Sequence, residues 1–312
     1  MTTTQIGLGL AALGRPDYIN IRQNSNIDKS KIAFKNNAFE VMDLAYKNGI
    51  RYFDTAPSYG LGEQFLLDWK NERQYQDIIL STKWGYTYVA NWELGYDGKH
   101  EIKEHSLSKL NEQWETSKAL LPQLKIYQVH SATLESGILT DTSIHKRLFQ
   151  LKKKYGLQIG ISTSGSNQSE ILNIAKDITV NNESLFDSYQ VTYNIFEQST
   201  FDTLKNLKAS GKTIIIKEAL ANGRVFTNSK TKKQLEIFSK THNVGIDAIA
   251  LRFVIDTLQP NMVLSGASNI NHLTQNLKAL NFKLSLEELE LLKSLTIDSN
   301  EYWNERSGLA WN

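Results

Sequence analysis

Short runs of β-branched and aliphatic residues alternate with stretches of helical periodicity along almost the whole 312-residue chain. This alternation is typical of βαβ units, whose strands lie parallel in one sheet. Eight apolar runs qualify as strands: one near Ile6, and others that end near Asp54, Lys83, His130, Ser162, Thr192, Lys217 and Ser265. Eight such repeats favour an α/β fold of the closed (β/α)8 TIM-barrel type over an open doubly wound sheet.

The stretches between these runs predict the helices of the barrel. The first has an apolar face with helical spacing and is ended by Gly49; its members are Ala38, Val41, Met42, Ala45 and Tyr46. Further helices are expected over 101–119, 141–154, 167–177, 199–210, 231–241 and 269–279. Two surplus helices remain, one over 245–257 and a C-terminal one opened by the capping box Ser285-Leu286-Glu287-Glu288. The chain has only four prolines and no Pro/Gly/Ser-rich linker, so we expect a single domain over residues 1–312.

Charge and composition exclude several classes of function. The formal net charge of +2 gives no electrostatic reason to expect a nucleic-acid or membrane-surface partner. Because the chain has no cysteine, disulfides, Fe–S clusters, thiolate zinc sites and cysteine nucleophiles are excluded. The apolar run Ile6 to Leu13 has no Lys or Arg before it, so it reads as a buried strand rather than a targeting signal. No run approaches the roughly 18 apolar residues of a membrane span, and we expect a cytoplasmic protein.

Ionisable residues stand where three successive strands are predicted to end. Asp54, Lys83 and His130 terminate apolar runs, and Tyr59 follows Asp54 in a Gly-containing loop. In a barrel the catalytic groups lie at the C-terminal ends of the strands, so these four side chains are expected around one mouth. Taken singly, each has an ordinary structural explanation: a loop-capping acid, a surface cation, a core histidine and a half-buried aromatic.

At these residues the sequence resembles the aldo-keto reductase superfamily, over about Gly7 to Leu280. The motifs that carry the resemblance are Phe53-Asp54-Thr55-Ala56-Pro57-Ser58-Tyr59-Gly60 with Gly62-Glu63, then Ser81-Thr82-Lys83 and Val129-His130-Ser131. The resemblance implies an NAD(P)H-dependent oxidoreductase that reduces an aldehyde or ketone to an alcohol, or runs the reverse reaction, without a metal. Tyr59 is the implied proton donor.

The resemblance also implies a role for each neighbour of Tyr59. A free Tyr has a pKa near 10, and a nearby ammonium favours the phenolate, so Lys83 is expected to lower the pKa of Tyr59 towards neutral pH. Asp54 would hold the Lys83 ammonium and prevent an unpaired buried cation. His130 would hydrogen-bond the substrate oxygen and orient it.

The cofactor-binding residues implied by the resemblance lie on the later strands. Ser162 and Gln190 take the positions that hold the nicotinamide carboxamide in the family. The loop after the eighth strand suits phosphates at a helix N-terminus and contains Gly266, Ser268, His272, Gln275 and Asn276. After the seventh strand, Leu220, Gly223 and Arg224 resemble the loop over the pyrophosphate.

Three departures from the family pattern weaken this part of the match. Thr163 stands where Asn is usual, and Lys217-Glu218 stands where an aromatic commonly stacks on the nicotinamide. Gly266 and His272 replace the usual Lys and Arg for the 2′-phosphate. We therefore expect NADP(H) as cofactor, with NAD(H) possible.

Two other functions remain open on the sequence. A Schiff-base lyase on the same barrel could use Lys217 or Lys83 as amine nucleophile. A catalytically silent regulatory or binding subunit could retain the fold, because fold does not dictate activity. We expect a pocket with aromatic walls, which would suit sugars, aryl aldehydes and steroid-like ketones alike, so the sequence does not identify the carbonyl substrate. Candidate wall residues are Trp84, Tyr86, Tyr88, Trp92, Tyr96, Tyr302, Trp303 and Trp311.

Overall fold

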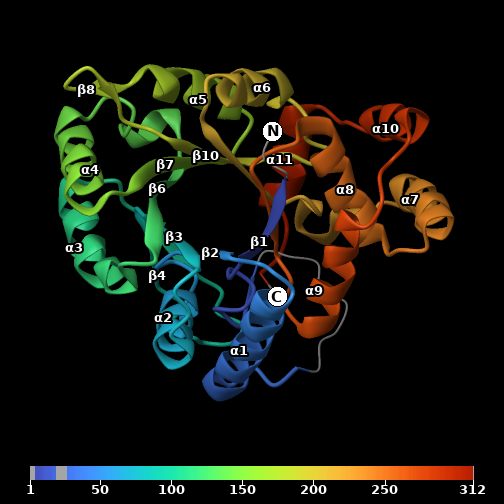
Figure 1. Cartoon of the computed structure of the whole chain (residues 1–312), viewed down its shortest axis with the longest axis horizontal. Helices are drawn as coiled ribbons and strands as arrows, with labels where there is room; N and C mark the ends of the chain where they lie inside the picture. The colour runs from blue at the N-terminus through green and yellow to red at the C-terminus, as the bar shows by residue number, and fades with distance from the viewer. Residues whose placement is uncertain (1–3, 19–26, 312) are drawn as a thin grey trace.

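The computed structural model describes residues 4–18 and 27–311, and residues 1–3, 19–26 and 312 of the expected domain lie outside the described part. Eight parallel strands close into a barrel in the order β1-β12-β11-β10-β7-β6-β3-β2 (Figure 1). Their bounds are β1 Gln5–Gly9, β2 Tyr52–Asp54, β3 Ile79–Trp84, β6 Leu124–Ala132, β7 Gln158–Thr163, β10 Ser188–Thr192, β11 Thr213–Lys217 and β12 Met262–Ser265. The expected (β/α)8 barrel is confirmed, and β1 closes it by pairing with both β2 and β12.

Helices surround the sheet on its outer side (Figure 1). They are α1 Lys31–Lys47, α2 Gly62–Arg73, α3 Leu107–Ser117, α4 Thr142–Tyr155, α5 Gln168–Asp177, α6 Phe201–Ala209, α7 Ser229–His242, α8 Ile246–Leu258, α9 Ile270–Leu277, α10 Leu286–Lys293 and α11 Ser299–Ser307. Short 3-10 turns follow at η1 Lys118–Leu120, η2 Leu134–Ser136, η3 Ala221–Phe226 and η4 Lys278–Leu280. Among the described residues, no helix is both long and apolar enough to cross a membrane.

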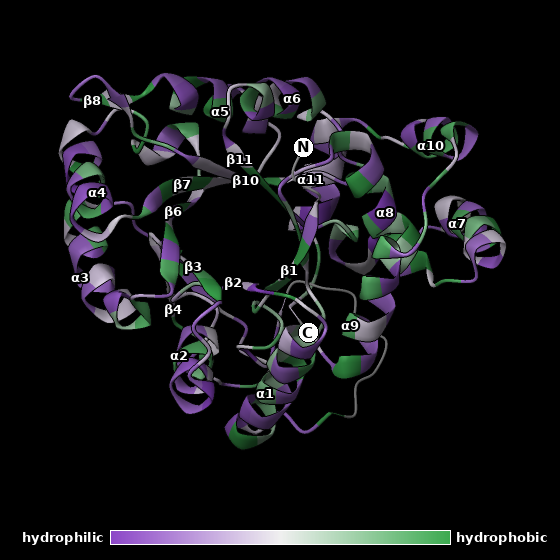
Figure 2. Ribbon diagram, viewed as in Figure 1, coloured by the Kyte–Doolittle hydropathy of each residue, from purple (hydrophilic) through white to green (hydrophobic). Residues whose placement is uncertain are grey.

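Local signals explain where these helices begin and end. Helix α4 starts at Asp141, whose side chain accepts from the backbone N–H groups of Ser143 and Ile144, and it stops at Gly156 in the left-handed conformation. Its apolar residues recur at helical spacing and are buried against the sheet. Figure 2 shows the result, with hydrophilic and hydrophobic residues alternating along the outer helices.

The inside of the barrel is filled by side chains from four strands. Tyr52, Ile126, Ile215, Met262 and Leu264 form a cluster of their own, separate from the larger core between sheet and helices. Small residues make room for it, because a Cβ on Gly7 would lie 2.7 Å from Tyr52 Cδ1. The barrel is therefore a packed core, and its site must lie at a strand end.

The helix expected over 101–119 is wrong in its first part. Glu101–Lys103 forms strand β5, which pairs antiparallel with β4, Tyr86–Tyr88. The helix starts only at Leu107, because the Ser106 side chain accepts from Lys109 N and caps it there. A second hairpin, β8 Thr179–Val180 with β9 Glu183–Ser184, precedes β10. The β4–β5 hairpin matters for function because it carries Glu101 to the mouth of the barrel.

The assignment of the surplus helices also needs correction. The stretch 231–241 was expected in the barrel layer and 245–257 outside it. In the structure α8 lies against the barrel, with every residue from Ala248 to Ile255 buried, and α7 lies outside α8 (Figure 1). The longer apolar run of α8 explains the order, since only a helix covered on both sides buries all its faces. Helices α2 and α11 were not expected.

Candidate active site

Three of the four ionisable candidates meet at the C-terminal edge of neighbouring strands. Asp54 ends β2, Lys83 lies on β3 and His130 lies on β6, next to β3 in the sheet. Lys83 Nζ donates to Asp54 Oδ2 at 2.5 Å and to the carbonyl oxygen of Thr55 at 2.9 Å. The Lys83 and Asp54 side chains are 0% and 2% exposed, so this ion pair is almost entirely removed from water.

Tyr59 comes to the same place from the loop after β2. Its ring centroid lies 4.8 Å from Lys83 Nζ and 5.6 Å from the His130 ring, which it meets edge-on at 83°. The loop packs against the segment after β1, and Leu61 N donates to the carbonyl oxygen of Gly14 in that segment at 2.7 Å. A Cβ on Gly14 would lie 2.2 Å from the carbonyl oxygen of Tyr59, so only glycine fits this contact.

The second oxygen of Asp54 is held by two buried amides. Gln190 Nε2 on β10 donates to Asp54 Oδ1 at 3.0 Å, and Gln128 Nε2 on β6 does so at 3.3 Å. Gln128 also donates to Ser81 Oγ at 2.8 Å. Hydrogen bonds from neutral donors stabilise a carboxylate without adding charge, so Asp54 stays available as the counter-ion of Lys83.

Burial sets the protonation states of the three other groups. It raises the pKa of the Tyr59 phenol well above its usual value, Asp54 raises it further, and the Arg15 guanidinium lowers it. Burial lowers the pKa of His130 well below its usual value, and the Lys83 charge adds to this. Burial likewise lowers the pKa of Lys83, with Asp54 opposing. At neutral pH the site therefore presents a neutral phenol beside a neutral imidazole.

The expectation that Lys83 lowers the pKa of Tyr59 does not hold in this arrangement. Asp54 lies 2.5 Å from the Lys83 ammonium, so the phenol faces an ion pair rather than a single cation. Arg15 is the cation that opposes the effect of burial. Its guanidinium lies 5.3 Å from the Tyr59 ring centroid.

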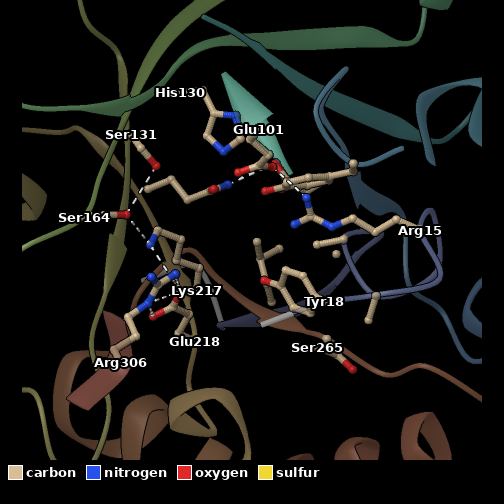
Figure 3. Close-up of a pocket in the computed structure, with 18 of the residues that line it drawn as sticks. Arg15, Tyr18, Glu101, His130, Ser131, Ser164, Lys217, Glu218, Ser265 and Arg306 are labelled. Carbon is tan, nitrogen blue, oxygen red and sulfur yellow. Dashed lines mark hydrogen bonds and ion pairs between the residues drawn. The ribbon is translucent and has the colours of Figure 1, made fainter. Parts of the chain in front are cut away.

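Arg15, Asp54, Tyr59 and His130 line a cavity of ≈ 180 Å³ at the barrel mouth, whereas the fully buried Lys83 is bonded to Asp54 but is not part of the lining (Figure 3). Its wall continues from Tyr59 and His130 through Ser131, Ser164 and Gln190 to Lys217 and Glu218, and then to Leu264, Ser265 and Gly266. A single hollow thus joins the ionisable cluster to the loop after β12.

One side of the mouth is built around Arg15. The guanidinium donates to Glu101 Oε1 at 2.6 Å and to the carbonyl oxygen of Ser58 at 3.0 Å. It also lies 4.6 Å from the Tyr18 ring centroid and 4.9 Å from that of Trp311, within the range of cation–π contacts. The chain's C-terminal end, the β4–β5 hairpin and the loop after β1 therefore meet over the cavity.

The opposite side carries a hydrogen-bonded chain of polar side chains (Figure 3). Lys217 Nζ donates to Thr192 Oγ1 at 2.8 Å and to Ser164 Oγ at 3.2 Å. Ser164 Oγ lies 3.3 Å from Ser131 Oγ. Glu218, with a left-handed φ of 56°, turns its carboxylate towards Arg306 on α11.

The expected carboxamide contacts are only partly in the cavity. Gln190 lines it, with Nε2 bonded to Asp54. Ser162 is fully buried behind the wall, where its Oγ accepts from Ser131 N at 2.8 Å. Ser164, two residues further on, is the residue of this strand end that faces the cavity.

The loop after β12 has the expected form of a helix N-terminus. Asn269 caps α9 by accepting from His272 N at 2.9 Å, and His272 Nδ1 lies 3.1 Å from Ser268 Oγ. Partial burial lowers the pKa of His272, and the nearby Asp247 carboxylate opposes this. Gln275 lies half-buried on α9, and Gly266 lines the cavity with nothing within 4 Å of the place of a Cβ.

Asn276 and Asp247 are joined behind this loop. In the amide orientation that satisfies both polar atoms, Asn276 donates to Asp247 Oδ2 at 2.9 Å and accepts from Ser265 Oγ at 2.8 Å. The side chain of Asn276 is buried. It therefore supports the loop and brings a carboxylate near His272, a neighbour that sequence reasoning did not find.

Of the ten cofactor candidates, only Gln190 and Gly266 line the cavity, and Arg224 is one of those that the structure places away from it. Its guanidinium is buried against α11, donating to the carbonyl oxygen of Tyr302 and to Glu305 Oε2, both at 3.1 Å. Leu220 and Gly223 belong to the same turn, in which Gly223 has a φ of 89° that suits glycine. This turn holds α11 in place.

Five residues of the cavity wall with polar or charged side chains escaped the sequence analysis: Arg15, Tyr18, Glu101, Ser164 and Arg306. Arg15 and Tyr18 lie in the loop after β1, Glu101 on β5 and Arg306 on α11, so these four do not stand at a predicted strand end. Ser164 directly follows the end of β7. Of the aromatics expected in the wall, Trp311 lines the cavity and Tyr86 packs on the His130 ring at 4.9 Å. Trp84 is fully buried, and Tyr88 and Trp92 line a separate hollow.

The comparisons with known proteins agree on one family. The sequence model of the Aldo/keto reductase family matches residues 5–297. The chain is 26% identical over 305 residues to the probable aryl-alcohol dehydrogenase AAD4 of Saccharomyces cerevisiae, with 84% of this chain and 88% of that protein covered. It is 24% identical over 278 residues to D-threo-aldose 1-dehydrogenase of a Pseudomonas species, with 77% and 82% covered.

A solved structure has the same fold. The aldo-keto reductase AKR11C1 from Bacillus halodurans, in its holo form, matches with a TM-score of 0.66 at 22% identity, and 96% of each chain is covered. At this identity the likeness establishes the barrel architecture alone.

Proposed function

The chain belongs to the aldo/keto reductase family, a family of oxidoreductases that act on carbonyl compounds, and on this premise we propose that it interconverts an aldehyde or ketone and its alcohol with NAD(P)(H), using Tyr59 as proton donor. The observation that carries the proposal is the convergence of Tyr59, His130 and Asp54 at the cavity, with the buried Lys83 paired to Asp54 at 2.5 Å. The names of relatives, an aryl-alcohol dehydrogenase and an aldose dehydrogenase, point to the same pair of functional groups.

In the direction of reduction, the Tyr59 hydroxyl would donate its proton to the oxygen of the carbonyl group as that oxygen becomes an alkoxide. The raised pKa of Tyr59 keeps the phenol protonated at neutral pH, which is the form that this step needs. The neutral His130 imidazole would donate a hydrogen bond to the same oxygen. The Arg15 guanidinium would keep positive charge near the phenolate that remains.

A nicotinamide cofactor fits the residues present. The cavity reaches Ser265 and Gly266, where the missing Cβ leaves the backbone open beside the N-terminus of α9. Gln190, Ser164 and Lys217 offer polar groups in the wall between this loop and Tyr59. When bound, the cofactor would supply or accept the hydride that the side chains of this chain cannot provide.

We assign the remaining contacts as follows. Gly266, Ser268, His272 and Gln275 would contact the phosphates and the adenosine, while Asn276 and Ser162 would act through the backbone that they hold. Leu220 and Gly223 would cover the pyrophosphate, and Arg224 would fix that turn against α11. Because the pKa of His272 is lowered and Asp247 lies near it, a 2′-phosphate meets little positive charge here. NADP(H) and NAD(H) should therefore be discriminated only modestly, by roughly tenfold.

The proposal is tested by turnover. The purified chain is assayed with a panel of sugar, aryl and aliphatic aldehydes, with NADPH and NADH in parallel, by loss of absorbance of the reduced cofactor. We expect carbonyl-dependent oxidation of at least one cofactor. Borohydride trapping of a substrate on Lys217 or Lys83, without any cofactor turnover, would instead establish the lyase. Cofactor binding without turnover on any carbonyl would establish a silent binding subunit.

A further inference from the structure

Lys217 is a cation in the cavity wall that the proposed reaction does not use. It ends β11, and its side chain is 15% exposed. Its ammonium donates to the hydroxyls of Thr192 and Ser164, and the nearest carboxylate oxygen, Glu218 Oε1, is 3.8 Å away. An ammonium has three donors, and among the described residues only these two hydroxyls accept from it within hydrogen-bond distance. A donor of Lys217 is left for a ligand.

Among the cations at the mouth of the barrel, Lys217 is also the one that has no carboxylate of the described residues within hydrogen-bond distance. The other cations at the mouth each have a close carboxylate: Lys83 has Asp54 at 2.5 Å and Arg15 has Glu101 at 2.6 Å. Arg306 grips Glu218 through both Nε and Nη2, with a shortest distance of 2.5 Å. Glu218 is therefore neutralised chiefly by Arg306. Once the buried Lys83 behind the wall is counted as the partner of Asp54, the described ionisable residues at the mouth carry one net positive charge, at Lys217.

Charge distinguishes the two forms of a nicotinamide cofactor. The oxidised ring carries a positive charge that the reduced ring lacks, whereas the two forms have nearly the same size and the same polar groups. A fixed cation beside the ring in a site of low dielectric therefore weakens binding of the oxidised form selectively.

We propose that Lys217, lying in the wall between Gln190 and the loop after β12, disfavours the oxidised nicotinamide and so makes the bound cofactor a better hydride acceptor. This proposal rests on the proposed function and adds a direction to it. Since the reduced form is bound more tightly, the equilibrium on the protein moves towards reduced cofactor and carbonyl product. The site is thereby biased to alcohol oxidation.

The bias should depend on pH. Burial lowers the pKa of Lys217 to about 8, with Glu218 opposing and Arg306 adding to the decrease. Of the charges on the neighbouring strands, Lys83 on β3 lowers the pKa of Lys217 and Asp54 on β2 raises it. The ammonium is charged below this value, so discrimination against the oxidised form should be full near pH 6.5 and fade as the pH rises past 8.

The test measures binding rather than turnover. Dissociation constants of the oxidised and reduced cofactor are determined by quenching of tryptophan fluorescence, between pH 6.5 and 9.5, for the wild type, Lys217→Gln and Lys217→Arg. We expect the ratio of the oxidised to the reduced constant to fall at least tenfold in Lys217→Gln at pH 6.5. In Lys217→Arg the ratio of the two dissociation constants at pH 6.5 should equal that of the wild type. In Lys217→Gln this ratio should no longer depend on pH.

Lys212 provides a matched control on the same strand connection. It precedes β11 at the far end of the barrel, where its ammonium donates to Ser184 Oγ and the carbonyl oxygen of Phe186. Lys212→Gln removes the same charge and should leave the ratio unchanged. If Lys217→Gln weakens both cofactor forms equally, Lys217 has only a structural role and the inference is wrong. If the wild type binds neither form, it is the proposed function itself that fails.

Discussion

The pKa of Tyr59, the proposed proton donor, is set by burial and by a cation that comes from outside the strand ends. Tyr59 lies between the His130 ring and the Arg15 guanidinium, and the Lys83 charge is already neutralised by Asp54. The phenol is thus the stable form over the usual range of pH, because desolvation penalises the phenolate more than Arg15 favours it. A neutral phenol suits the proton transfer of carbonyl reduction. In alcohol oxidation, which the proposed effect of Lys217 on the cofactor favours, Tyr59 must first lose its proton.

Replacement of Tyr59 by Phe removes the proton donor and leaves the rest of the cavity wall in place. We expect Tyr59→Phe to lower kcat for carbonyl reduction by about 10²- to 10⁴-fold, the usual contribution of general acid catalysis. Cofactor binding, followed by fluorescence, should be retained. Tyr46→Phe, on the outer helix α1, is the control and should keep wild-type activity. Reduction by Tyr59→Phe within a few-fold of the wild type would remove Tyr59 from the mechanism.

Arg15 allows a test of the pKa argument. Alcohol oxidation needs the Tyr59 phenolate, whose pKa is raised by burial, so kcat for oxidation should rise with pH up to at least pH 9.5. Arg15→Gln removes the charge that lowers this pKa and should slow oxidation at each pH, about tenfold for each unit by which the pKa rises. Arg15→Lys keeps a positive charge, and its rate of oxidation should lie between those of the wild type and Arg15→Gln. A plateau of the wild-type rate below pH 9 would contradict the raised pKa.

At the scale of elements, the cavity depends on α11, which follows the barrel in sequence and contributes part of its wall. Tyr302 fastens this helix: its ring is fully buried, its hydroxyl accepts from Asn194 Nδ2 at 2.9 Å, and its carbonyl oxygen accepts from Arg224. Arg306, one turn further on, reaches Glu218. The turn after β11 and the loop after β10 thus hold the helix from two directions.

This arrangement predicts the cost of loosening α11. Tyr302→Phe removes one hydrogen bond and should lower the free energy of unfolding by about 1 kcal/mol. Tyr302→Ala also leaves a cavity and should cost about 3–5 kcal/mol. Tyr155→Phe, on the outer helix α4, is the control and should have little effect. Urea denaturation measures all three; equal stability of Tyr302→Ala and the wild type would show that α11 is not fastened there.

At the scale of the whole molecule, the packing of side chains inside the barrel positions residues of the candidate active site. A Cβ on Gly160 of β7 would lie 2.5 Å from Ser188 Oγ and 2.7 Å from Gln128 Cγ. Gln128 in turn donates to Asp54, the counter-ion of Lys83. The small residue at position 160 therefore leaves the space in which the amide that holds Asp54 is placed.

Gly160→Ala should overpack this interior and lower the free energy of unfolding by about 1–3 kcal/mol. Gly9→Ala is the matched control, because a Cβ there would meet Ser265 O at an ordinary 3.6 Å. Both are compared by urea denaturation. If the two variants are equally stable, the interior of the barrel is looser than the contacts at Gly160 indicate.

The amino-acid sequence alone determined the barrel and the positions of Asp54, Tyr59, Lys83 and His130. Both follow from local features of the sequence. The alternation of strand and helix periodicity is detectable in short stretches of sequence, and the strands of a barrel bring their C-terminal ends to one mouth. Gly266 also lines the cavity, in the loop after the eighth strand where the family resemblance had placed a cofactor contact.

Only the tertiary structure decided which groups complete the site. Arg15, Glu101 and Arg306 come from a loop, a hairpin and a terminal helix, whose places depend on contacts between residues distant in the chain. The same reason explains why the helix over 101–119 gave way to strand β5, and why α8 rather than α7 covers the barrel. Periodicity shows that a helix has an apolar face, but which surface that face meets is settled by the packing of the whole chain.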